Sequence, residues 1–126
     1  MVSHVWKFLI VLSAAILPAL LPIDAVKADS LTWTFRSDHP NVVSLEFYSK
    51  TRNHVWPGDG KVYILDDSEE HTYNLGCRTG EKICYGAWVR NRSDEYWGVG
   101  YDGKEGCTGC CYTCGAGATK VFVLNP

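Results

Sequence analysis

Four of the six cysteines lie within eight residues near the C-terminus, where two C-x-x-C steps stand back to back as Cys107, Cys110, Cys111 and Cys114. Paired as disulfides, such cysteines stabilise a small fold, whereas as thiolates they ligate soft metal ions or take part in redox exchange. Which chemistry applies depends on the compartment, because disulfides persist outside the reducing cytosol. The cellular location is therefore the first property to establish.

The N-terminal segment predicts export. An almost wholly apolar stretch over residues 8–23 follows the cation Lys7, and residues 25–28 supply the small side chains that a signal peptidase recognises. We interpret residues 1–28 as a signal peptide and residues 29–126 as one secreted or periplasmic β domain. Because the apolar stretch is shorter than the roughly 20 residues of a membrane helix, we expect no stable membrane span after cleavage; the alternative is an uncleaved anchor.

In an exported chain, the six cysteines predict a framework of three disulfides. Adjacent Cys110 and Cys111 would close a strained ring if they bonded to each other, so each should bond elsewhere. Cys77 and Cys84 flank a hairpin-like loop, and they could pair across it or each could bond to the C-terminal cluster. The sequence leaves these connectivities open.

The alternative interpretation makes Cys107, Cys110, Cys111 and Cys114 ligands for copper or zinc. Copper(I) fits this spacing better, because structural zinc sites set their two C-x-x-C steps well apart and here the two steps adjoin. A redox C-x-x-C pair normally precedes a helix, whereas glycines, alanines and then a strand-like segment follow Cys114. We therefore expect structural disulfides and no cofactor, with a thiolate metal-binding or redox protein as the alternative function.

Short segments that alternate apolar and polar residues, or that are rich in β-branched and aromatic residues, indicate about seven strands. They cover residues 31–36, 43–48, 62–65, 71–77, 82–90, 95–101 and 119–124. Turn-forming residues separate them, and we expect 71–77 to run back beside 62–65. The pattern predicts an all-β fold, a small antiparallel β-sandwich or partly open barrel with a disulfide-stapled C-terminal loop and almost no helix.

A hairpin with its loop at residues 91–94 should join two of these strands. Pairing Arg90 with Glu95 places Trp88 opposite Trp97, and the same face then carries Tyr101. The other face carries the row of Ile83, Tyr85, Ala87 and Val89, which we expect to point into the core. A slip of one residue would exchange the two faces.

The row of Trp88, Trp97 and Tyr101, together with Trp56 on a nearby Pro-Gly loop, is the candidate ligand-binding surface. Flat apolar rings with a polar edge suit stacking on sugar rings or contact with a protein partner. The competing explanation is that this face is simply a second buried layer, covered by the N-terminal strand.

The remaining features argue against several functional classes. The net charge is −2 and the basic residues are scattered singly, so we expect no nucleic-acid partner. The sequence contains no G-x-S-x-G or papain-like signature, and we expect no catalysis. We expect a binding or envelope-associated module that contacts carbohydrate or a protein partner; the pattern does not indicate the oligomeric state.

Overall fold

The structure, a computed structural model, describes residues 27–126 and confirms the all-β class. The predicted signal peptide lies outside these residues apart from Lys27 and Ala28, at which the first strand begins. The strands are β1 (Ala28–Ser37), β2 (Val43–Ser49), β3 (Val55–Trp56), β4 (Tyr63–Leu65), β5 (His71–Arg78), β6 (Lys82–Val89), β7 (Arg92–Gly98), β8 (Cys111–Thr113) and β9 (Gly117–Leu124). Within this part of the chain, the helical content is a single 3-10 turn, η1 (Tyr101–Gly103).

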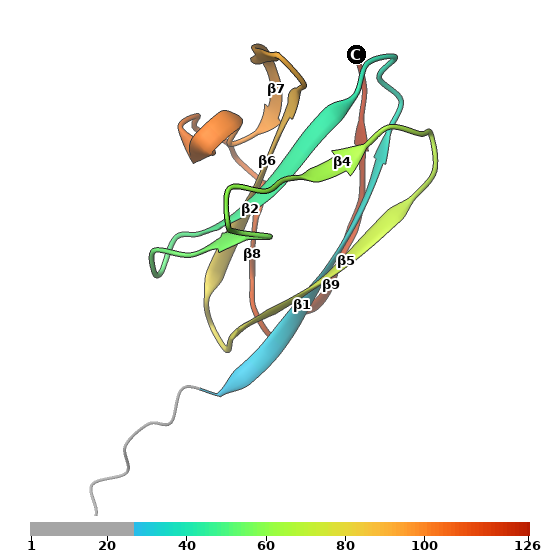
Figure 1. The fold of residues 1–126 in the computed structure, drawn as a ribbon. Helices are drawn as coiled ribbons and strands as arrows, with labels where there is room; N and C mark the ends of the chain where they lie inside the picture. Colours follow the sequence, from blue (N-terminus) through green and yellow to red (C-terminus); the bar gives the residue numbers. More distant parts are fainter. Residues whose placement is uncertain (1–26) are drawn as a thin grey trace, which may run out of the picture.

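The strands form two sheets (Figure 1). The smaller sheet has the order β5-β1-β9, in which β1 pairs antiparallel with β5 and parallel with β9. The larger sheet has the order β3-β2-β6-β7, with β4 also paired to β2 and β8 also paired to β6. Strands β3 and β8 are additions to the predicted set, and they contain only two and three residues.

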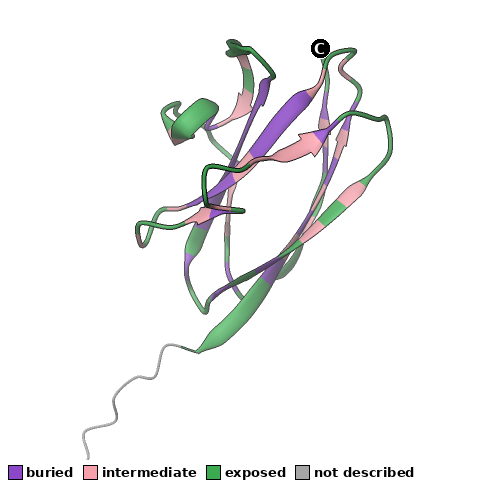
Figure 2. Cartoon of the chain, viewed as in Figure 1, coloured by how far each residue is buried: buried purple, intermediate pink, exposed green. Residues whose placement is uncertain are grey.

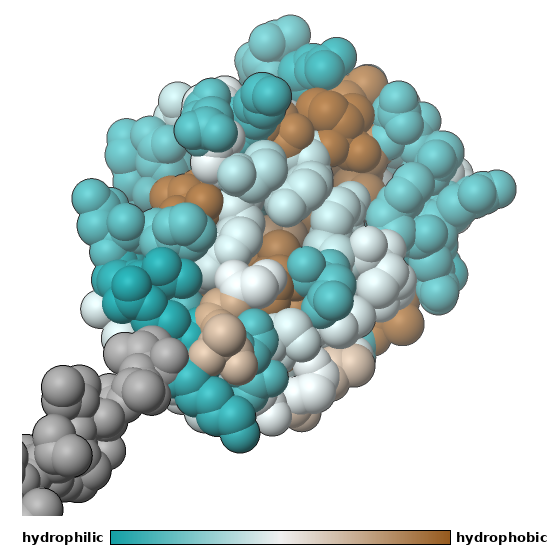
Figure 3. Space-filling model, turned by 60° about the horizontal axis from the view of Figure 1, so that its bottom comes forward, coloured by the Kyte–Doolittle hydropathy of each residue, from teal (hydrophilic) through white to brown (hydrophobic). Residues whose placement is uncertain are grey.

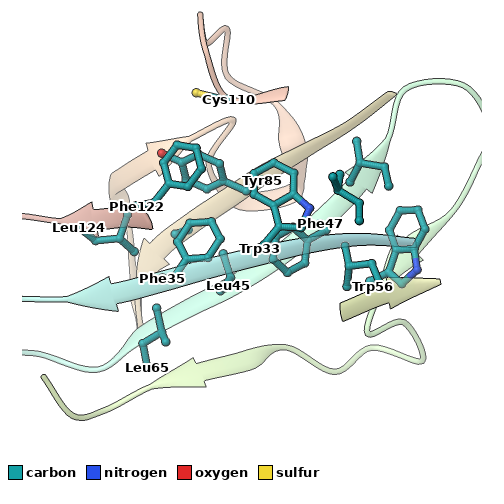
Figure 4. Packing of buried hydrophobic residues seen from close by; sticks show 14 of the residues in the cluster. Trp33, Phe35, Leu45, Phe47, Trp56, Leu65, Tyr85, Cys110, Phe122 and Leu124 are labelled. Atoms are coloured by element: carbon teal, nitrogen blue, oxygen red, sulfur yellow. The ribbon is translucent and has the colours of Figure 1, made fainter. Parts of the chain in front are cut away.

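The two sheets share one aromatic core, which the alternation along each strand creates. Trp33 and Phe35 point inward from β1, and Phe47 meets them from β2 with its ring centroid 5.1 Å from that of Trp33 (Figure 4). Tyr85 from β6 and Phe122 from β9 complete the cluster. The row predicted to face the core, Ile83 to Val89 at alternate positions, is buried as expected.

One predicted pairing is wrong. Strands β4 and β5 are not neighbours, because β4 pairs with β2 in the larger sheet and β5 pairs with β1 in the smaller one. The acidic segment 66–70 therefore carries the chain from one sheet to the other. A tight hairpin needs a short turn with residues at positive φ, and this five-residue segment has none.

All six cysteines form disulfides, which confirms the predicted framework. Cys77 bonds Cys114 and Cys84 bonds Cys111, so each of the two earlier cysteines joins the C-terminal cluster, and Cys107 bonds Cys110. The four residues of the alternative thiolate site are thus all in disulfides here. This pattern is compatible with an extracellular environment. Among residues 27–126 no helix has the length and apolar character that a membrane span requires.

A buried ion pair reinforces the end of the molecule near the Cys77–Cys114 disulfide. The side chain of Glu81 is 1% exposed and accepts hydrogen bonds from the Arg52 guanidinium, the Ser49 hydroxyl at 2.6 Å and the Arg78 backbone N–H at 3.0 Å. Burial alone would raise the pKa of Glu81, but these hydrogen bonds outweigh it and lower the pKa to about 2. Its backbone carbonyl also accepts a hydrogen bond from Cys114. The carboxylate therefore links β2 and β5, which belong to different sheets.

The disulfides should differ in their contribution to stability. Replacing Cys77 and Cys114 by Ser should lower the free energy of unfolding by about 2 to 5 kcal/mol, because this bond closes a long loop. The double variant Cys107→Ser with Cys110→Ser should lose less, since only three positions separate its partners. Urea denaturation of both variants measures the difference, and equal losses would contradict this ranking.

Replacing Glu81 by Gln should lower the free energy of unfolding by about 3 to 5 kcal/mol at neutral pH, because it leaves the buried hydrogen-bond donors without their charged acceptor. The pKa of Glu81 is lower in the folded state than its unfolded value of about 4.3, so its contribution is complete above that value and disappears as the pH falls toward about 2. The difference between wild type and E81Q should shrink over that interval. Urea denaturation at several pH values tests this, with the exposed Glu69→Gln as a matched control.

Candidate functional site

Residues 99–103 lie on the outer face of β6 and β2 in the larger sheet, and the N-terminal strand β1 belongs to the other sheet. Strand β6 is consequently buried on both faces, as the continuous purple along it shows (Figure 2). Gly86 permits this arrangement, because a Cβ atom there would collide with the Gly100 carbonyl oxygen and lie 2.9 Å from the Tyr48 ring. The chain thus crosses the sheet at the one outward position of β6 that lacks a side chain, and η1 lies on top of it.

The β6–β7 hairpin differs from the predicted one by one residue over most of its length. Its turn is Arg90–Asn91, with Asn91 at a φ of 65°, and Val89 pairs with Arg92. The register then shifts, so that Trp88 pairs with Tyr96 and Ala87 with Trp97. The expected pairing of Trp88 with Trp97 is therefore wrong. The physical reason is that residues 93–95 are accommodated as an irregularity in β7 instead of forming the loop.

Trp88 and Tyr101 lie together, although Tyr101 comes from η1 and not from the predicted strand 95–101, which ends at Gly98. Their ring centroids are 5.1 Å apart in an edge-to-face arrangement, with Trp88 only 7% exposed and Tyr101 45% exposed. Trp88 is therefore the buried ring of this pair, and Tyr101 is the ring that a ligand can reach. The ammonium of Lys104 lies 5.8 Å from the centroid of the Tyr101 ring.

The two rings line an open hollow of about 420 Å³ together with Asn91, Arg92 and Ser93 from the hairpin tip. These three polar residues are exposed, as is most of η1 (Figure 2). The hollow thus combines an aromatic surface with an amide, a guanidinium and a hydroxyl. We call it the aromatic hollow.

The other two tryptophans of the predicted surface lie elsewhere. Trp56 is 8% exposed and belongs to the core cluster, where its indole N–H donates to the Gly76 carbonyl at 3.0 Å. Trp97 is half-buried against the same cluster and donates to the Asn125 carbonyl at 2.9 Å. Neither lines the aromatic hollow.

Tyr96 is the aromatic residue that the sequence analysis missed. It is 42% exposed and lies directly across from Trp88, so its side chain shares the outer face. Its ring also flanks Gly100, where a Cβ atom would lie 3.2 Å from Cδ2. The signal that could have revealed it was Asn91, because asparagine tolerates positive φ and so favours a turn one position earlier.

Comparison with known proteins found no matching family model, no matching curated protein and no matching solved structure. In the described part of the chain, no group of three or more His, Cys, Asp or Glu side chains is placed to hold a metal ion. On the face shown in Figure 3, hydrophobic residues form separate areas among hydrophilic ones.

Replacing Gly86 by Ala should displace residues 99–105 from the sheet and separate Tyr101 from Trp88, at a cost of about 1 to 3 kcal/mol in the free energy of unfolding. Gly76→Ala is the matched control, because Gly76 is also a strand residue and a Cβ there meets no atom within 4 Å. Chemical-shift changes of the Trp88 indole N–H and of the residues in 99–105 would report the displacement. Equal, small changes in both variants would show that the contact at Gly86 does not position η1.

Proposed function

We propose that this protein is a secreted or periplasmic, disulfide-stabilised binding module without catalysis of its own, and that it binds carbohydrate in the aromatic hollow. The observation that carries the proposal is the exposed Tyr101 ring, supported from beneath by Trp88 and bordered by Asn91, Arg92 and Ser93.

Carbohydrate matches this combination because a sugar ring has an apolar C–H face and a periphery of hydroxyl groups. The apolar face stacks on an aromatic ring, while the hydroxyl groups need hydrogen-bond partners at the edge. Asn91 supplies both a donor and an acceptor, Arg92 supplies donors and Ser93 supplies either. The volume of about 420 Å³ lies within the range of small-molecule sites.

The location is supported by two independent features. Residues 1–28 have the pattern of a signal peptide, and the mature part has three disulfides, which a reducing cytosol would not maintain. An exported module that binds carbohydrate would meet its ligand at the cell envelope or outside the cell.

Replacing Tyr101 by Ala should weaken binding to oligosaccharides by at least about tenfold, equivalent to about 1.4 kcal/mol, because the accessible stacking surface is removed. Tyr101→Phe should retain most of the affinity, since it keeps the ring. A glycan array screen would identify a ligand, and isothermal titration calorimetry would measure its affinity for each variant.

Val121→Ala is the control, because Val121 lies on β9 of the other sheet and has a similar exposed fraction of 44%. It should bind with wild-type affinity. If wild-type protein binds no glycan, or if Y101A and V121A bind equally well, the aromatic hollow is not a carbohydrate site.

A further inference from the structure

The Cys107–Cys110 disulfide differs from the other two disulfides in what it joins. Those two bonds link β5 and β6 to the segment 111–114, across sequence separations of 37 and 27 residues. The Cys107–Cys110 bond closes a loop with a separation of only three residues, and both partners lie between η1 and β8. Breaking this bond therefore separates no strand from another.

Cys107 is the most accessible of the six cysteines. It is exposed, whereas Cys111 is half-buried and the remaining four cysteines are buried. Its partner Cys110 is 4% exposed and belongs to the core cluster. A thiolate that approaches from solvent therefore reaches Cys107 and not Cys110.

The backbone holds the two ends of this bond differently. The Cys110 carbonyl accepts a hydrogen bond from the Tyr85 backbone N–H at 3.1 Å, which fixes Cys110 to β6. In the described part of the chain, no backbone–backbone hydrogen bond involves residues 106–109. When the disulfide breaks, Cys107 can thus move away while Cys110 stays on the sheet.

We propose that the Cys107–Cys110 disulfide is a site of thiol–disulfide exchange, at which this protein oxidises a dithiol of a partner protein. This inference goes beyond the proposed carbohydrate function and does not depend on it. Exposed disulfides are more readily reduced than buried structural ones, and the rate of exchange depends on access to the attacked sulfur. C-x-x-C is also the spacing of redox-active cysteine pairs.

The exchange takes place in two steps. A thiolate of the partner attacks Cys107 Sγ, the bond to Cys110 breaks, and Cys110 leaves as a thiolate that takes up a proton. The partner's second thiolate then attacks the partner sulfur of this mixed disulfide and releases Cys107 as a thiolate, which also takes up a proton. The partner loses two electrons and two protons as its disulfide forms, and Cys107 and Cys110 receive them.

The nucleophile comes from the partner and not from this protein. Within residues 27–126, strand β8 and no helix follows the C-x-x-C pair, so no helix N-terminus activates its thiols for attack. After reduction, the released Cys110 is adjacent to Cys111, and a bond between these two would close a strained ring. Cys84, the partner of Cys111, is fully buried. The Cys84–Cys111 bond therefore stays intact.

The test treats the folded protein with an excess of reduced thioredoxin, a protein dithiol, for increasing times. Acid quenching, unfolding, alkylation and peptide mass spectrometry then identify the reduced cysteines. Cys107 and Cys110 should be reduced at least about tenfold faster than the other four cysteines, with the native near-UV circular dichroism retained. Reduction of all three disulfides at one rate, or loss of the native signal when Cys107–Cys110 breaks, would overturn the proposal.

Two single variants test which sulfur is attacked. Cys110→Ser keeps the exposed Cys107 thiol, which should form a mixed disulfide with oxidised glutathione, detected as an increase in mass. Cys107→Ser is the matched control, because it keeps the buried Cys110 thiol, which should react at least about tenfold more slowly. Equal rates in the two variants would show that Cys107 is not the accessible end of the bond, and the proposal would be wrong.

Discussion

The close approach of the Gly100 backbone to Gly86 is the constraint on which the outer face of the larger sheet depends. Outward positions on β6 alternate along the strand, and the three consecutive ones are Cys84, Gly86 and Trp88. Each contacts the chain that follows β7 in a different way. Cys84 bonds Cys111, Gly86 admits the backbone, and Trp88 packs on Tyr101.

This arrangement explains how a segment with few apolar residues stays on the sheet. Between β7 and β8, only Val99, Gly100 and Cys110 are buried, so burial of apolar surface contributes little there. Two disulfides to β5 and β6 hold its C-terminal end instead. Because η1 has only three residues, it leaves the aromatic hollow open between Tyr101 and the hairpin tip.

The sequence predicted all the strands except the short β3 and β8, the core-facing row of β6 and the disulfide framework, because alternation and cysteine content are local signals. It could not choose the partners of β5 and β9, since both pair with β1 across long separations. Nor could it detect the irregularity at residues 93–95, which changes the partner of Trp88 from Trp97 to Tyr96. A shift of one residue moves a side chain to the opposite face, so the predicted aromatic surface was correct only in part.

Two of the predicted surface tryptophans have structural roles that the composition does not reveal. Trp56 and Trp97 each donate the indole N–H to a backbone carbonyl, at Gly76 and Asn125, whereas the indole N–H of the fully buried Trp33 has no partner among residues 27–126. The two carbonyls hold Trp56 and Trp97 in place. Both acceptors are distant in sequence, so no local pattern reveals them. Once these two rings are assigned to structural roles, Trp88 with Tyr101 and Tyr96 remains as the aromatic surface of the outer face. An exposed ring that is supported by a buried one is an arrangement that stability alone does not require.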